Sequence, residues 1–313
     1  MKIIFFGSAK FGSESLKGLI EAGYEIPLVV TQADKQKGRG LKLGNTPIKD
    51  LAQAERLKIF QPENINAPDS LSLLRSLEPD LFVIIAYGQK LSSELLAIPK
   101  ILPINVHASL LPKYRGAAPI NWAIINGDKQ TGNTIMKVIL KMDAGPIISQ
   151  SRVAIEDTDD SLSIEEKLSQ DSRILLLRAV KEIETQNYKL IEQEEVRASI
   201  APKLDGKITE INWNEPADKI YNLVRGCANW SAAFTKYKDK IIKIHKAQLE
   251  NSGDFEGKFS PGEIIEVKDS GIIIATGKGA LIIKELQFEG KKRLFVKEFL
   301  SGSKMLKGEK FEN

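Results

Sequence analysis

Short apolar runs alternate with longer amphipathic stretches over the first part of the chain. The apolar runs are rich in β-branched residues, as is typical of buried strands, and lie at Ile3–Phe6, Ile26–Thr31, Leu81–Ala86, Ile104–His107 and Thr134–Ile139. Helical patterns separate them, at Ser13–Ala22, Pro47–Arg56, Ser70–Leu77, Ser92–Ile98 and Pro119–Asn126. Strands that alternate with helices favour a mostly parallel sheet with helices on both faces. We therefore expect a Rossmann-like α/β domain.

The pattern changes toward the C-terminus. A long helical pattern begins near Ser161, and the polar stretch Gln186–Arg197 is typical of a connection between domains. A helical pattern then precedes a series of short strand-like segments, at Ala232–Tyr237, Ile241–Glu250, Glu263–Lys268, Gly271–Thr276 and Ala280–Phe288. Short strands in succession favour a small OB-like β-barrel. We predict an α/β domain over residues 1–186, a linker over 187–205 and a barrel domain over 206–313.

Composition narrows the class of protein. Of the 313 residues, 42% are hydrophobic and 27% are charged, as in many soluble globular proteins. The apolar runs are too short to cross a bilayer. The single cysteine, Cys227, excludes an internal disulfide, and the presence of only two histidines, His107 and His245, argues against a metal site. We expect a cytoplasmic protein with no bound metal ion.

The net charge of +4 is unevenly distributed. Residues 1–200 carry 25 basic and 25 acidic side chains, whereas residues 201–313 carry 20 basic and 16 acidic ones. A basic C-terminal third can attract a polyanion such as nucleic acid. A solvated, lysine-rich surface would give the same balance, and charge alone leaves both interpretations open.

Polar side chains gather where two of the predicted strands end. Asn105 and His107 are two residues apart near the end of one strand, so their side chains point to the same face. Asp143 follows the next strand on a loop with a glycine, from which its carboxylate could reach the histidine. A strand cap and an ordinary turn are the alternatives. Because asparagine is disfavoured within strands and ligands bind beyond strand carboxyl ends, a functional site is favoured.

The residues around this cluster resemble the motifs of the folate-dependent formyltransferases. The match begins with Asn105-x-His107-x-Ser109-Leu110-Leu111-Pro112 and continues with Tyr114-Arg115-Gly116-Ala117-Ala118-Pro119-Ile120, Gly127-Asp128, Thr131-Gly132, Thr134-Ile135-Met136 and Asp143. Further matches are Ile3-Ile4-Phe5-x-Gly7, Thr31-Gln32-x-Asp34, Pro79-Asp80 and Ala86-Tyr87-Gly88. With the C-terminal domain, the resemblance covers nearly the whole chain.

The resemblance implies a reaction and its catalytic residues. 10-Formyltetrahydrofolate would donate its formyl group to the α-amino group of methionyl-tRNA, for translation initiation. Asn105 and His107 would hold the formyl oxygen, while Asp143 would orient His107 and favour its charged form. Such donors stabilise the oxyanion of a tetrahedral intermediate. No metal is implied, and the loop after the first strand lacks the spacing of a dinucleotide-binding loop.

The resemblance also implies two binding sites. The folate would lie along Ser109, Leu110, Leu111 and Pro112 and beside Ala86, Tyr87 and Gly88. The acceptor stem of the initiator tRNA would meet a cationic, glycine-containing loop through Lys35, Lys37, Arg39 and Lys42. A solvated loop without a ligand is the alternative for that segment. The basic C-terminal domain would hold the tRNA body, and we expect a monomer.

Related activities are the nearest alternatives. The acceptor could be an amino sugar nucleotide or a glycinamide nucleotide, and a formyltetrahydrofolate hydrolase would use water instead of an amine. A glycinamide enzyme needs only the first domain, a sugar enzyme does not need the cationic loop, and a hydrolase does not need a basic barrel. A non-catalytic tRNA-binding protein would not need the catalytic residues. The segments Ala144–Ile147 and Cys227–Ala232 depart from the usual family pattern, which affects loop geometry rather than the catalytic positions.

Overall fold

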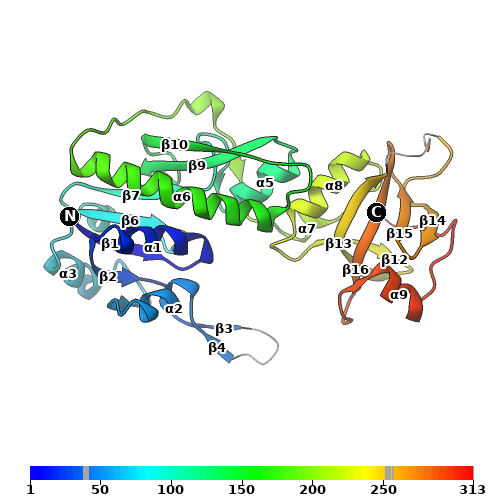
Figure 1. Ribbon diagram of the computed structural model, residues 1–313, viewed down its shortest axis with the longest axis horizontal. Helices are drawn as coiled ribbons and strands as arrows, with labels where there is room; N and C mark the ends of the chain where they lie inside the picture. The colour runs from blue at the N-terminus through cyan, green and yellow to red at the C-terminus, as the bar shows by residue number, and fades with distance from the viewer. Residues whose placement is uncertain (38–41, 251–254, 256, 313) are drawn as a thin grey trace. The chain divides into compact units, whose positions relative to one another are not determined.

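The computed structural model describes residues 1–37, 42–250, 255 and 257–312. They form two compact units (Figure 1). The first unit consists of Met1–Pro119, Gln130–Ala154 and Glu165–Ala201, and the second of Ile120–Lys129, Ile155–Ile164 and Pro202–Asn313. Two short segments of the expected α/β domain thus belong to the second unit. The domain boundaries expected from the sequence stay a prediction, because contacts do not show which part folds independently.

A seven-stranded sheet runs through the first unit. Its spatial order is β10-β9-β7-β6-β1-β2-β5, and its strands are β1 Lys2–Gly7, β2 Glu25–Val30, β5 Ile59–Phe60, β6 Leu81–Ile85, β7 Leu102–His107, β9 Gln130–Lys137 and β10 Ile147–Ala154. The strands from β7 to β5 pair in parallel, whereas β9 and β10 add antiparallel pairs at one edge. The predicted mostly parallel sheet is therefore confirmed. The edge strand β10 was not predicted, because Ser149, Gln150 and Ser151 interrupt its apolar pattern.

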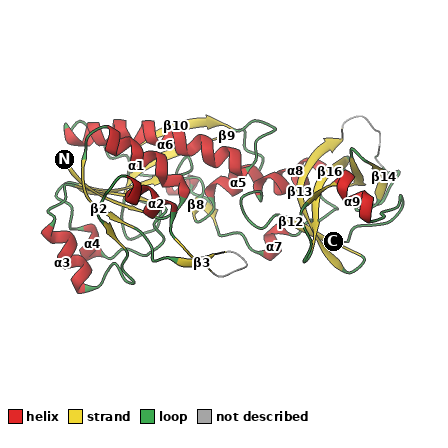
Figure 2. Ribbon diagram, turned by 60° about the horizontal axis from the view of Figure 1, so that its bottom comes forward, coloured by secondary structure: helices red, strands yellow, loops and turns green. Residues whose placement is uncertain are grey.

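Helices lie on both faces of this sheet (Figure 2). The helices of this part of the chain are α1 Ser13–Glu21, α2 Pro47–Ala54, α3 Pro68–Ser76, α4 Ser93–Leu96, α5 Pro119–Ile125 and α6 Ser161–Glu184. On one face, Phe6 of β1 packs in a cluster with Leu74 of α3 and Leu95 of α4. Ser15 of α1 and Ser172 of α6 are joined by a buried hydrogen bond of 2.9 Å. Burial on both faces explains the continuous apolar runs in the sequence.

The second unit is an antiparallel β domain. Its spatial order is β12-β13-β16-β15-β14, and its strands are β12 Ala233–Tyr237, β13 Lys240–Glu250, β14 Ile264–Lys268, β15 Gly271–Ala275 and β16 Ala280–Phe288. Helix α8 (Ala217–Gly226) packs against this sheet through Ile220 and Val224. These strands confirm the predicted small β domain. The short β17 (Leu294–Phe295) and α9 (Val296–Gly302) were not predicted.

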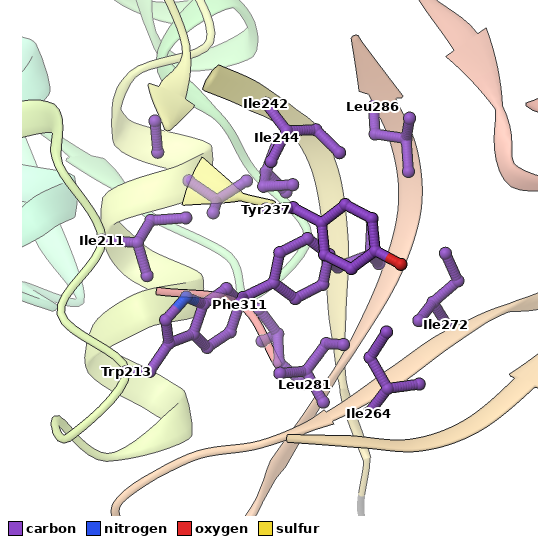
Figure 3. Close-up of a cluster of buried hydrophobic side chains, with 14 of the residues drawn as sticks. Ile211, Trp213, Tyr237, Ile242, Ile244, Ile264, Ile272, Leu281, Leu286 and Phe311 are labelled. Carbon is purple, nitrogen blue, oxygen red and sulfur yellow. The ribbon is translucent and has the colours of Figure 1, made fainter. Parts of the chain in front are cut away.

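The last described residues join the two edges of this sheet. Lys310 forms an antiparallel bridge to Glu263, just before β14, and Glu312 forms one to Lys236 of β12. Between them, Phe311 is 1% exposed and stacks on Trp213, with 5.6 Å between the ring centroids. Both rings lie within the apolar cluster that fills the domain (Figure 3). The two bridges therefore close the sheet into a barrel.

Candidate active site

The candidate catalytic residues meet at the carboxyl end of β7. Asn105 and His107 lie on this strand, between β6 and β9. Their side chains leave the same face, because they are two residues apart. His107 is 6% exposed, whereas Asn105 is half-buried. Within the described part of the chain, the side-chain amide of Asn105 has no hydrogen-bond partner, so both of its N–H groups are available to a ligand.

The imidazole of His107 is held between two loops. Its Nε2 lies 2.9 Å from the carbonyl oxygen of Tyr114, and because a carbonyl only accepts, Nε2 carries a proton. Its Nδ1 lies 3.7 Å from Oδ2 of Asp143, which is longer than a direct hydrogen bond. The same oxygen accepts a 2.8 Å hydrogen bond from the backbone N–H of Gly116. Nδ1 is therefore the nitrogen that faces the carboxylate and is open to a reacting group.

Unusual backbone conformations accompany this arrangement. Ala86 follows β6 with a φ of 48°, Tyr114 has a φ of 63°, and Asp143 has a φ of 51°. Residues with a Cβ atom rarely adopt positive φ, and they keep it only where the surroundings enforce it. Such residues are common at functional sites, and here each lies on a loop expected to take part in binding or catalysis.

The loop after β7 is fixed to β9 through one hydroxyl group. Oγ1 of Thr134 donates to the carbonyl oxygen of Ser109 at 2.6 Å and accepts from the N–H of Leu111 at 3.1 Å. The side chains of Ser109 and Leu111 are buried. Leu110 and Pro112 are partly exposed. Of the folate-binding residues expected on this loop, these two present apolar surface to a ligand.

The loop after β6 leaves the same edge of the sheet, since β6 and β7 are parallel neighbours. Ala86 and Gly88 are exposed, whereas the ring of Tyr87 is buried edge-on against Phe6, with 5.6 Å between centroids. The Tyr87 hydroxyl is buried with no partner among the described residues, and burial raises its pKa. This loop therefore offers a ligand mainly its backbone.

Three of the four residues expected to contact tRNA lie on the strands of a β-hairpin. Its strands β3 (Lys35–Lys37) and β4 (Lys42–Gly44) are antiparallel. The hairpin follows the carboxyl end of β2 and so leaves the sheet at the same edge as the loops after β6 and β7. Arg39, and the side chains of Lys35, Lys37 and Lys42, lie outside what the structure describes.

Sequence reasoning did not single out two residues that hold Asp143 in place. The backbone N–H of Gly116 contacts its carboxylate, and Nε2 of Gln193 donates to the carbonyl oxygens of Asp143 and Gly145, at 2.9 and 2.8 Å. Gly116 belongs to the recognised motif and could have been found there. Gln193 lies in the polar stretch interpreted as a connection, where nothing in the sequence distinguishes it.

The arrangement suits acyl transfer. An available amide, an imidazole and a carboxylate can together stabilise the oxyanion that forms when a nucleophile attacks a carbonyl carbon. The family model of the formyl transferases matches residues 1–180, and that of the formyl transferase C-terminal domain matches residues 203–304. The chain therefore belongs to the formyltransferase family.

Within this family, the chain is similar along nearly its whole length to methionyl-tRNA formyltransferases. It is 41% identical to the methionyl-tRNA formyltransferase of Clostridium tetani over 98% of each chain. It is also 41% identical to that of Alkaliphilus metalliredigens, over 98% of this chain and 97% of the relative.

Solved structures share the fold at lower sequence identity. An N-formyltransferase from Helicobacter canadensis, in complex with folinic acid and dTDP-3-aminofucose, matches with a TM-score of 0.70 and 18% identity, over 90% of this chain and 98% of that chain. The methionyl-tRNA formyltransferase from Clostridium thermocellum matches with a TM-score of 0.56 and 18% identity, over 81% and 95%. Similarity at this level of identity concerns the fold alone.

No helix of the described residues is long and apolar enough to cross a membrane. In the same residues, no group of three or more His, Cys, Asp or Glu side chains is arranged to hold a metal ion. The thiol of Cys227 is buried, which raises its pKa to about 12. A thiol with so high a pKa is a poor nucleophile at neutral pH.

Proposed function

We propose that the chain transfers the formyl group of 10-formyltetrahydrofolate to the α-amino group of methionyl-initiator-tRNA, for translation initiation. Similarity to methionyl-tRNA formyltransferases over 98% of the chain supports the choice of acceptor. The chemistry depends on one observation, namely that Nδ1 of His107 faces Asp143 at 3.7 Å on the same strand face as the available amide of Asn105.

The attacking amine needs little activation. An α-amino group has a pKa of about 8, so a substantial fraction is neutral at physiological pH. Attack on the formyl carbon creates an oxyanion, which can accept hydrogen bonds from the Asn105 amide and from Nδ1–H of a protonated His107. Asp143 then offsets the charge on the imidazolium. The Asp143 carboxylate is placed to take up the proton that the attacking amine gives up, and Nδ1–H of the imidazolium to supply one to the leaving folate nitrogen; transfer of the proton from Asp143 to Nδ1 then restores both groups.

The two loops beside this site fit a folate. A pterin ring is usually held by apolar side chains together with a few backbone donors and acceptors. Leu110 and Pro112 supply apolar surface, and the exposed backbone around Ala86 and Gly88 supplies polar groups. Gly88 has a φ of 88°, and an added Cβ would lie 2.5 Å from Nε2 of Gln32. Glycine adopts this φ without the steric cost that a Cβ atom brings.

The β3–β4 hairpin supports a tRNA acceptor. It leaves the sheet at the edge where the reaction would occur, and Lys35, Lys37, Arg39 and Lys42 can contact backbone phosphates. The excess of basic side chains in residues 201–313 can attract the rest of the tRNA. A sugar nucleotide carries far fewer phosphates and would gain little from either feature.

A panel of acceptors tests the proposal. With 10-formyltetrahydrofolate as donor, we expect charged initiator methionyl-tRNA to be formylated with a much higher kcat/KM than charged elongator methionyl-tRNA, free methionine or a dTDP-linked amino sugar. Arg39→Ala should lower kcat/KM for the tRNA while leaving folate affinity unchanged. Transfer to the amino sugar but not to tRNA would show a sugar formyltransferase. Formate release without any acceptor would show a hydrolase.

A further inference from the structure

Residues 191–201 form a segment that runs alongside the loops that hold His107. Ile191 pairs with Ile147 at the start of β10 through two backbone hydrogen bonds. Further on, β11 (Ile200–Ala201) pairs in parallel with β8 (Arg115–Gly116). The whole segment lies in the first compact unit. It is therefore part of the framework of the candidate active site and not a free tether.

The segment fixes the loop that contacts Nε2 of His107. Oγ of Ser199 accepts from the N–H of Tyr114 at 2.9 Å, and the carbonyl oxygen of Ser199 accepts from the N–H of Arg115 at 2.8 Å. The carbonyl oxygen of Ala201 accepts from the N–H of Ala117 at 2.9 Å. These bonds support the positive φ of Tyr114, whose carbonyl oxygen accepts the hydrogen bond from Nε2–H of His107.

Gln193 of the same segment fixes the loop that faces Nδ1. Its Nε2 donates to the carbonyl oxygens of Asp143 and Gly145, at 2.9 and 2.8 Å, which satisfies both hydrogens of the amide. Its Oε1 accepts from Nε and Nη2 of Arg115, at 3.0 and 2.8 Å. Gln193 is thus a direct bridge between the loop of Asp143 and the strand that follows Tyr114.

The bridge has a rigid anchor. Arg115 is 4% exposed, and its guanidinium also donates to both carboxylate oxygens of Glu195, at 3.1 Å each. Hydrogen bonds from Arg115 and then Lys141 lower the pKa of the Glu195 carboxyl. A buried guanidinium that is paired along two of its edges is held in a single orientation. Because Arg115 fixes the side chain of Gln193, the hydrogen bonds from Gln193 fix the position of the Asp143 loop.

From these contacts we propose that Gln193 is a positioning residue for formyl transfer, which sets the separation between Asp143 and His107. Asp143 keeps a φ of 51°, and the hydrogen bonds from Gln193 to the carbonyl oxygens of Asp143 and Gly145 restrain the backbone of this loop from outside. The inference rests on the proposed function, because it assigns Gln193 a part in the chemistry of Asp143.

Two substitutions separate the two ends of the bridge. Gln193→Met keeps the length of the side chain and removes every hydrogen bond. Gln193→Glu keeps an acceptor for Arg115 and removes the donor to the two carbonyl oxygens. We expect both variants to lower kcat by about 10-fold to 100-fold, because small displacements of catalytic groups are costly. KM for the folate and for the tRNA should change less than about twofold, since the side-chain amide of Gln193 is engaged by Arg115 and by two backbone carbonyl oxygens. Gln170→Met, at an exposed position of α6, is the matched control.

Two further readouts distinguish positioning from general stability. The chain has one histidine in each unit, His107 in the first and His245 in the second. In an NMR spectrum of Gln193→Met, the Cε1–H resonance of His107 should shift while that of His245 stays in place. In a double-mutant cycle, adding Gln193→Met to Asp143→Asn should cause almost no further loss of kcat, because both changes remove the same contribution.

The outcomes identify which proposal fails. Gln193 variants with normal kcat, in a protein that Asp143→Asn inactivates, would overturn the positioning role alone. So would fully multiplicative losses in the double-mutant cycle, or a shift of the His245 resonance equal to that of His107. Normal activity of Asp143→Asn would instead overturn the proposed chemistry itself.

Discussion

The two compact units differ in whether their buried polar groups have hydrogen-bond partners. In the first unit, the side-chain amide of Asn105, near the carboxyl end of β7, has no partner among the described residues. The same unit contains all the buried side-chain polar atoms that lack a partner among the described residues, on Tyr87, Thr131, Asn133 and Ser149. In the second unit, polar groups that enter the apolar cluster are paired. Nε1 of Trp213 donates to Oγ1 of Thr235 at 3.0 Å, and that hydroxyl donates to the carbonyl oxygen of Glu312 at 2.6 Å.

This difference separates the sources of activity and stability. Unpaired donors raise the free energy of the folded state but can be satisfied by a transition state. A paired, apolar interior lowers that free energy and does nothing for chemistry. The chain offers separate reporters, since its three tryptophans, Trp122, Trp213 and Trp230, all lie in the second unit. Tryptophan fluorescence therefore follows the unfolding of that unit.

The largest effect should come from Phe311→Ala. Phe311 packs against Trp213 and Tyr237, with 5.6 and 5.3 Å between ring centroids, so its loss leaves a cavity in the barrel. We expect a loss of about 3–5 kcal/mol in the free energy of unfolding, from denaturant curves followed by tryptophan fluorescence. Phe295→Ala, at a side chain that is 54% exposed, is the control and should cost little. Similar losses in both variants would show that the tail does not close the core.

Asn105→Ala should have a slightly smaller effect, and on turnover only. Removing one oxyanion donor lowers kcat by about 10²–10³, or roughly 2.7–4 kcal/mol. Because the amide has no partner in the described residues, the unfolding transitions should not shift downward. Single-turnover formylation and thermal unfolding measure the two properties on the same protein. An inactive variant that also unfolds early would mean that Asn105 is structural.

Glu309→Gln also tests the closure of the barrel, with a smaller expected effect on stability. The carboxylate accepts hydrogen bonds from Lys238 at 2.5 Å, from the Tyr237 hydroxyl and from the N–H of Leu306 at 2.8 Å. The bond from Lys238, then that from Tyr237, lowers the pKa of Glu309 from 4.5 to about 2. The free energy of unfolding of the variant should be lower than that of the wild type by about 1–2 kcal/mol at pH 7.

The contribution of Glu309 to the free energy of unfolding should decrease as the pH falls. A depressed pKa means that the unfolded chain binds a proton first as the pH falls, so the stabilisation is complete above pH 4.5 and disappears toward pH 2. The difference in the free energy of unfolding between the wild type and Glu309→Gln should therefore become smaller as the pH falls from 4.5 to 2, as measured by urea unfolding at each pH. Glu312→Gln, at an exposed carboxylate of the same tail, should follow the wild type. A constant difference across pH would mean that the charge of Glu309 is not involved.

Most of the fold could be predicted from the sequence because its strands are buried. Ile3–Phe6 and Leu81–Ala86 are apolar on both faces, which a central parallel strand requires. β10 escaped prediction because Ser149, Gln150 and Ser151 interrupt its apolar pattern at an edge. α9 escaped prediction because it is a single short helix whose N-terminus, at Phe295, is capped by Glu298 rather than by a residue of the usual capping type.

The candidate site was only partly predictable, for a different reason. Asp143 lies 3.7 Å from His107, but not because neighbouring strands end at one edge: β9 runs antiparallel to β7, and the loop between β9 and β10 brings the carboxylate to the imidazole. The network that joins Arg115 to Gln193 and Glu195 spans 78 to 80 residues of the chain. No local periodicity or turn preference encodes such a pairing. Only the three-dimensional path of residues 191–201 brings these side chains together.

The closure of the barrel has a consequence for biosynthesis. The strands of the second unit emerge from the ribosome one after another, yet the bridges of Lys310 and Glu312 that join its edges are made by residues translated after all of them. Until then, β12 and β14 are open edges that can pair with other chains. The nascent domain is therefore most exposed to aggregation in the interval between the emergence of β16 and that of Phe311.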